Sequence, residues 1–145
     1  MSRDPIIIKS PREIEIMRKA GKITAGARSV ARAAIADGLT TKQIDKAVNE
    51  FIVKSRAIPT FKGYGGFPAS TCISINEEVI HGIPSRHRVI REGDIVSIDT
   101  GAKVDGFNGD NACTYAVGKI DLEAQRLLDC LLYTSPSPRD MRRSR

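Results

Sequence analysis

The sequence DIVSIDTGAKVDGFNGDNACTY (Asp94–Tyr115) predicts a β-hairpin around which the other elements are arranged. Its first half is rich in β-branched residues, which favour strands. Asp105-Gly106 is a favoured two-residue turn of type I′, because both central positions need a positive φ. With that turn Val104 faces Phe107, and this pair fixes the register of the whole hairpin.

Two acidic residues fall on one face of the predicted hairpin. Asp110 faces Gly101, and Asp99 lies two residues from Gly101 on the same side, so the carboxylates are diagonal neighbours with Cβ atoms about 7 Å apart or somewhat less. Gly101 has no side chain and would leave room above the sheet. Neighbouring carboxylates repel unless a positive charge lies between them, and a divalent metal or a metal pair supplies it. The alternative is two solvent-facing acids, and a register shift of one residue would separate them.

Composition narrows the class of protein. A chain of 145 residues with 41% hydrophobic and 28% charged residues fits one soluble globular domain. We expect no membrane span and a cytoplasmic location, because no long apolar run and no signal peptide are visible. Three widely spaced cysteines form no disulfide framework. Half of the net charge of +6 lies in the last seven residues, RDMRRSR, and aromatics are few, so specific nucleic-acid binding is not expected.

Two amphipathic helices precede the hairpin. Ser10–Glu13 forms a capping box with proline at the first helical position, and the helix is predicted to run to about Ala36. Thr40–Gln43 forms a second capping box, and that helix is predicted to end near Ser55. Both helices carry apolar residues at three- and four-residue spacing, so we expect each to pack one face onto the sheet.

Shorter segments complete the expected elements. Ile6–Ile8 is a strand-like apolar run, Thr71–Ile75 is a predicted strand, and Asp121–Leu132 is compatible with a helix. Residues 133–145 are rich in Ser, Pro and Arg, a composition that buries little surface and predicts disorder.

Two further features suggest a site. The Gly- and Pro-rich segment Ile58–Pro68 carries Phe61, Tyr64 and Phe67, which would either line a small-ligand pocket or pin the loop to the core. His81 follows an apolar run and precedes Gly-Ile-Pro, so we expect it where a strand breaks into a loop. A lone histidine is more often structural than catalytic, and the residues leave both alternatives open.

With these residues in view, the chain resembles the N-terminal half of a bacterial type I methionine aminopeptidase, over about Ile7 to Leu132. The specific motifs are FKGYGGFPASTCISINEEVIHGIP (61–84) and REGDIVSIDTGAKVDGFNGD (91–110). The resemblance implies an α+β pita-bread (creatinase/aminopeptidase-like) fold, of which this chain holds the N-terminal half only: an antiparallel sheet with two packed helices. Residues 1–132 would form that half of the catalytic domain, and residues 133–145 a tail foreign to the family.

The resemblance also implies roles for individual residues. Asp99 would bind chiefly one of two divalent metal ions (Co, Mn, Fe or Zn), and Asp110 would bridge both. His81 would be catalytic, contacting the scissile peptide. The residues expected to contact the methionine side chain or lie beside it are Phe61, Tyr64, Phe67 and Cys72, with His81 at the peptide bond. Asn76 would lie near a monovalent cation.

The implied function is metal-dependent removal of the N-terminal methionine from peptides and nascent proteins, which would place the protein near the ribosome. The family needs one more His and two Glu as ligands, yet no His follows His87 and the only Glu after Asp110 is Glu123. We therefore expect a truncated, inactive and poorly soluble fragment. One alternative is a non-catalytic pita-bread module that binds protein or RNA; another is a dipeptide or creatine-type hydrolase of the same fold. Non-catalytic relatives tend to lose metal ligands, so the presence of Asp99, Asp110 and His81 disfavours the module. The YGGFP and HGIP motifs disfavour the other hydrolases.

Overall fold

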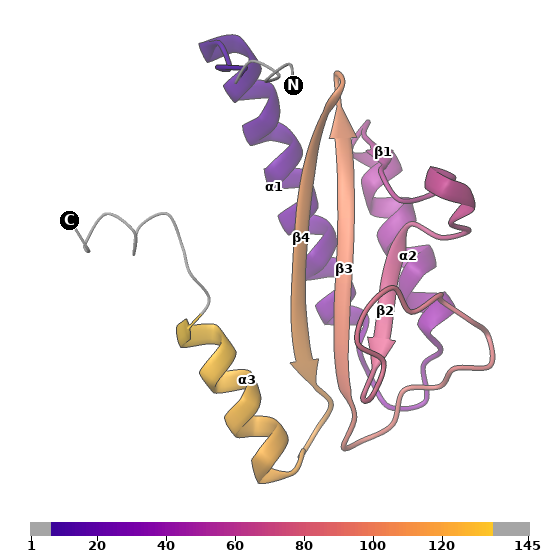
Figure 1. The fold of residues 1–145 in the computed structure, drawn as a ribbon. Helices are drawn as coiled ribbons and strands as arrows, with labels where there is room; N and C mark the ends of the chain where they lie inside the picture. Colours follow the sequence, from indigo (N-terminus) through magenta and orange to yellow (C-terminus); the bar gives the residue numbers. More distant parts are fainter. Residues whose placement is uncertain (1–6, 135–145) are drawn as a thin grey trace, which may run out of the picture.

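The computed structural model describes residues 7–134. Its elements are arranged as one antiparallel sheet with two long helices against one face and a third helix beside the outer strand (Figure 1). In chain order they are α1 (Pro11–Ala34), α2 (Thr41–Lys54), β1 (Ile58–Pro59), the 3-10 turn η1 (Tyr64–Gly66), β2 (Thr71–Ile75), β3 (Ile95–Val104), β4 (Phe107–Ala116) and α3 (Leu122–Thr134).

The sheet is built around β3. Along one of its edges β3 pairs with β1 and β2, and along the other it pairs with β4 over its full length. The predicted hairpin register is confirmed: Val104 pairs with Phe107, and the turn residues Asp105 and Gly106 both have positive φ. Alternate β3 residues such as Val96 and Ile98 are buried against the helices, so the other face of β3 is left for a site.

Both predicted capping boxes are present. The Ser10 and Thr40 hydroxyls accept hydrogen bonds from the backbone N–H three residues on, and the Glu13 and Gln43 side chains accept bonds from the cap residues. The first helix ends at Ala34, two residues earlier than predicted. The following residue is extended, and the chain turns there to form a hydrogen bond from Gly38 N to the carbonyl of Ile90.

α1 and β4 pack very closely where Gly109 meets Ala20 and Thr24, a contact that we call the seam. Ala20 of α1 is fully buried against β4, and a Cβ placed on Gly109 would lie 2.7 Å from the Ala20 carbonyl oxygen and from Thr24 Oγ1. Only glycine fits at that position, because a methyl group would overlap the backbone of the helix. The seam therefore fixes the distance between α1 and β4.

Two expected strand segments are not strands. Ile7 and Ile8 form no strand and are 73% and 90% exposed, while Ile6 lies outside the described residues. Val79 and Ile80 lie in an exposed loop, so His81 does not follow a strand. A strand needs a partner strand to take up its backbone hydrogen bonds, and Ile7, Ile8, Val79 and Ile80 belong to none of the strand pairs of the described residues.

The third helix is as predicted but longer at its C-terminal end. α3 extends to Thr134, two residues beyond the expected limit, and residues 135–145 of the expected tail lie outside the described residues. In the described part of the chain, no helix has both the length and the apolarity to span a bilayer.

Candidate metal and peptide site

The two hairpin carboxylates lie together, as the register predicts. Asp110 pairs with Gly101 and Asp99 pairs with Ala112, which places the acids diagonally on the sheet face away from the helices. Both side chains line a pocket of about 570 Å³, which we call the acidic pocket.

Within residues 7–134, neither Asp99 nor Asp110 forms an ion pair. Burial raises the pKa of Asp99 to about 6, and the negative charge of Asp110 adds to the effect, while nearby His81 opposes it. The Asp99 Oδ1 atom is buried and has no hydrogen-bond partner. A buried carboxylate oxygen without a donor is costly, and a bound cation would satisfy it. The carboxylate oxygens of Asp99 and Asp110 are therefore suitable ligands for a metal ion.

The ligand set is nevertheless incomplete. Within residues 7–134, no group of three or more His, Cys, Asp and Glu side chains is arranged to hold a metal. Two carboxylates form an open site, and a metal with so few protein ligands binds weakly.

The space above Gly101 is filled, which corrects the expectation of open room there. A Cβ on Gly101 would lie 3.2 Å from Phe61 Cε1 and 3.1 Å from Thr60 Cβ. The backbone N–H of Thr60 donates to the Gly101 carbonyl, so the loop is tied to β3 at this point. The missing side chain thus admits an aromatic ring beside the acids.

The glycine-rich loop supplies the aromatic wall of the acidic pocket. Phe61, Tyr64 and Phe67 all line it; Tyr64 is 83% exposed, whereas Phe61 and Phe67 are half-buried. The loop is closed by a hydrogen bond from Gly63 N to the Phe67 carbonyl, and its glycines have positive φ. The two alternatives are not exclusive, because the aromatics line the pocket while Phe61 also packs over Gly101 of β3. Proline and glycine residues of the same loop also line the pocket.

Cys72 joins this wall from β2. It pairs directly with Asp99 across the strands and is buried. Burial, followed by the charges of Asp99 and Asp110, raises the pKa of the Cys72 thiol to about 11. The side chain is therefore a neutral, polarisable thiol at neutral pH, suited to contact with an apolar ligand.

His81 is held at the pocket by a strained loop. Its φ is +60°, a conformation uncommon for residues other than glycine. The next residue, Gly82, donates to Ser74 Oγ and accepts from Ile73 N at 2.8 Å, which draws the loop onto β2. The strain is concentrated at a pocket-lining residue, as is common at functional sites.

Asn76 is the predicted site residue that the structure does not bring to the acidic pocket. Its side-chain amide donates to Asp94 Oδ1, and its side-chain oxygen accepts from Ile95 N. These bonds join the end of β2 to the start of β3. Ile83 lines the pocket although the residue pattern did not single it out; its position in the HGIP segment beside His81 was the available signal.

The acids should make stability depend on pH when metal is absent. Because the folded-state pKa of Asp99 is about 6, above its ordinary value of 3.8, the stabilisation from protonation is present below pH 4 and lost as pH rises through 6. Asp99→Asn should therefore raise the free energy of unfolding at pH 7 by about 1 kcal/mol, after discounting for solvent screening, and change it little at pH 4. Urea unfolding in EDTA across this range measures the difference; a constant offset at all pH values would contradict it.

An acidic pair in an aromatic- and thiol-lined pocket on an antiparallel sheet is consistent with a metallopeptidase half-site, and the comparisons with known proteins give the class. The chain belongs to metallopeptidase family M24, whose model matches residues 15–134. Its fold is the pita-bread arrangement shared by solved aminopeptidases and prolidase.

Several of the M24 proteins that the chain resembles are methionine aminopeptidases. It is 56% identical over 123 residues to the methionine aminopeptidase of Clostridium acetobutylicum, covering 85% of this chain and 49% of the relative. The crystal structure of Thermotoga maritima methionine aminopeptidase matches with a TM-score of 0.85 and 46% identity, covering 89% of this chain and 52% of that one. Prolidase from Pyrococcus furiosus matches at 27% identity and a TM-score of 0.76, covering 88% and 36%. The chain thus spans about half the length of the methionine aminopeptidases it matches.

Proposed function

We propose that this chain carries the N-terminal half of a methionine aminopeptidase site, residues 1–132, which serves metal-dependent removal of the N-terminal methionine from nascent proteins. The observation that carries the proposal is the placement of Asp99, Asp110 and His81 on one pocket walled by aromatics and a thiol. Identities of 56% and 50% to curated bacterial methionine aminopeptidases support methionine as the residue removed.

Each part of the acidic pocket has a role in this proposal. Asp99 and Asp110 would hold two divalent ions, Co, Mn, Fe or Zn, and such a metal pair supplies hydroxide near neutral pH. His81 would donate a hydrogen bond to the peptide unit and stabilise charge that develops there. The aromatic side chains and Cys72 would surround the flexible thioether of methionine.

We further propose that the 145-residue chain by itself hydrolyses nothing, because its described residues gather only two carboxylates at the site. Purified chain incubated with Mn²⁺ and a Met-Ala peptide should release no methionine above a metal-only blank. Release that disappears in Asp110→Asn would overturn this.

The cellular setting follows from the proposed substrate. Nascent chains carry the N-terminal methionine, so the protein would act in the cytoplasm close to the ribosome. The remaining alternative is a non-catalytic module that binds protein or RNA. It is disfavoured because the acids and the histidine line one pocket, and such a module has no need of an uncompensated acidic pair.

Divalent metal should stabilise the chain even without hydrolysis. A ligand that binds only the folded state adds RT ln(1 + [L]/Kd) to the free energy of unfolding, so Mn²⁺ at about ten times its dissociation constant should add about 1.4 kcal/mol and raise Tm by about 3–6 °C. A thermal melt with and without Mn²⁺ measures this. The double variant Asp99→Asn, Asp110→Asn should show no rise, whereas Asp105→Asn, at the hairpin turn, should respond as the parent does. Equal responses in all three chains would refute metal binding at the acidic pocket.

A further inference from the structure

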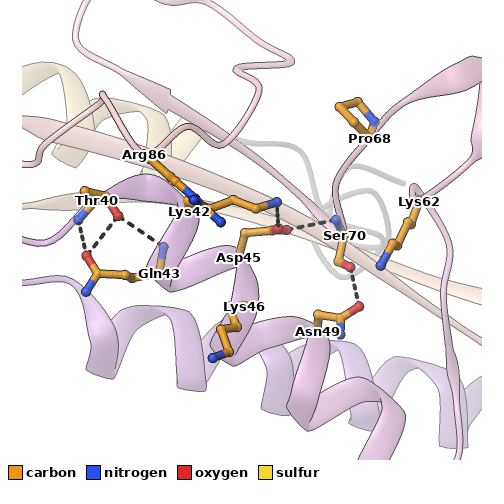
Figure 2. Close-up of a pocket in the computed structure, with 10 residues that line it drawn as sticks. All are labelled: Thr40, Lys42, Gln43, Asp45, Lys46, Asn49, Lys62, Pro68, Ser70 and Arg86. Carbon is orange, nitrogen blue, oxygen red and sulfur yellow. Dashed lines mark hydrogen bonds and ion pairs between the residues drawn. The ribbon is translucent and has the colours of Figure 1, made fainter.

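A second pocket, of about 550 Å³, lies over the first turns of α2 (Figure 2). We call it the basic pocket, after the four cationic side chains that line it: Lys42, Lys46, Lys62 and Arg86. They come from α2, from the glycine-rich loop and from the loop after His81. Pro68 lines both pockets, so the glycine-rich loop separates the basic pocket from the acidic one.

The acid in the basic pocket, Asp45, is already fully engaged. It is buried, and its Oδ1 atom accepts hydrogen bonds from Ser70 N at 2.8 Å and from Thr71 N and Oγ1 at 3.1 Å. Its Oδ2 atom accepts from Lys42 Nζ at 2.9 Å. Asp45 thus fastens α2 to the start of β2 and compensates Lys42 alone among the four cations.

The other three cations are left largely uncompensated. Within residues 7–134, Lys62 and Arg86 make no side-chain hydrogen bond or ion pair. Lys46 lies 4.0 Å from Glu50 on the exposed side of the helix, a separation and setting that contribute little. Like charges gathered around one hollow raise its positive potential and favour an anion there.

The loops that carry these cations are held in place by the backbone. Ser85 N donates to Thr41 Oγ1 and Thr41 N donates to the Arg88 carbonyl, so the loop bearing Arg86 is tied to α2. On the other side, hydrogen bonds from Thr60 N and Gly63 N hold the loop bearing Lys62. The cations are therefore presented from fixed segments on opposite sides of the hollow.

Binding in this pocket would depend on side chains, since the amides at the start of α2 are occupied. Thr41 N and Lys42 N donate to loop carbonyls, and Gln43 N donates to its cap residue Thr40. Asn49 accepts a hydrogen bond from Ser70 Oγ at 2.8 Å through its side-chain oxygen, which leaves its amide N–H groups to donate to a ligand (Figure 2).

We propose that the basic pocket binds phosphate groups. Two cations without a partner among the described residues, Lys62 and Arg86, and a third with only a weak ion pair, Lys46, match a multiply charged oxyanion better than a single carboxylate. The planar guanidinium of Arg86 can donate two parallel hydrogen bonds to phosphate oxygens. The volume falls within the range of small-molecule sites and exceeds what one inorganic phosphate needs, so a diphosphate or a phosphorylated nucleoside also fits. The proposal does not depend on the aminopeptidase assignment.

The test is titration of the full chain with inorganic phosphate, pyrophosphate and a short single-stranded RNA, followed by amide shifts in ¹H–¹⁵N NMR spectra. EDTA is included so that no metal at Asp99 and Asp110 can bind the phosphate. The amides of Lys62 and Arg86 and of the first turn of α2 should shift, and those beside Asp110 should not. Pyrophosphate should bind more tightly than phosphate.

The decisive variant is Lys62→Gln with Arg86→Gln, which removes two charges whose side chains make no contacts needed for folding. Because a charge-assisted hydrogen bond to phosphate is lost, pyrophosphate binding should weaken about tenfold. The control, Lys54→Gln with Lys103→Gln, removes the same net charge at exposed positions outside the pocket and should bind as the parent does. Equal weakening in both variants, or shifts spread over the whole basic surface, would overturn the proposal. If RNA binds and pyrophosphate does not, the pocket is not a phosphate site of this kind and the proposal also fails.

Discussion

If Asp110 binds metal as proposed, replacing it by Asn should lower kcat/KM for methionine release at least about a thousandfold in an active protein, because the carboxylate charge that would hold the metal disappears while the side-chain shape is kept. Since the chain spans about half the length of its methionine aminopeptidase relatives, the measurement needs a chimera. Residues 1–132 are joined to the second half of the Clostridium acetobutylicum enzyme, and hydrolysis of a Met-Ala-Ser peptide is followed with Mn²⁺.

The matched control for this loss is Asp105→Asn. It removes the same charge from the same hairpin, at a turn position where asparagine is equally suited to positive φ. The control should keep the parent's activity. An Asp110→Asn chimera within about tenfold of the parent would contradict the metal-ligand role. An inactive parent chimera would instead count against the proposal that this chain supplies a working half-site.

Gly82→Ala should destabilise the chain by about 3 kcal/mol and displace His81 from the acidic pocket. A Cβ on Gly82 would lie 2.1 Å from the Ile73 carbonyl oxygen, which is backbone and cannot rotate away. Either the loop lifts from β2 and loses the hydrogen bond from Ile73 N to Gly82, or β2 shifts. Urea unfolding measures the loss, and the NMR shift of the His81 ring reports the displacement.

Gly21→Ala is the matching control for this substitution. Gly21 lies inside α1 with no atom within 4 Å of an added Cβ, so alanine should be tolerated and should stabilise the helix by about 0.5–1 kcal/mol. If Gly82→Ala unfolded at the same denaturant concentration as the parent, the close approach to β2 would not be needed to hold the loop.

Sequence patterns between residues close in the chain predict most of the helices and strands of this fold. The Asp105-Gly106 turn fixes the hairpin register, and this register alone places Asp99 and Asp110 on one face. The capping boxes mark both helix starts, because they are contacts between residues three apart. Such features need no knowledge of the distant chain.

The parts that sequence reasoning missed depend on contacts between distant segments. Phe61 covers Gly101 only because Thr60 is hydrogen-bonded to β3, and nothing near Gly101 in the sequence indicates this. Likewise, His81 reaches the pocket from a loop drawn onto β2 rather than from a strand end. The sequence does not predict the basic pocket, because its cations come from three separate segments, each of which has the charge pattern of an ordinary exposed surface.

The tight seam at Gly109 has a consequence for the acid that follows it in β4. Ala20 blocks any movement of the strand toward α1, and the neighbouring residue, Asp110, projects from the opposite face. Contact with α1 therefore fixes the backbone of β4 at Asp110 even when no cation is bound. Metal binding should therefore reorient side chains without moving the strand. The entropy cost of ordering the backbone around Asp110 falls on folding and not on metal binding.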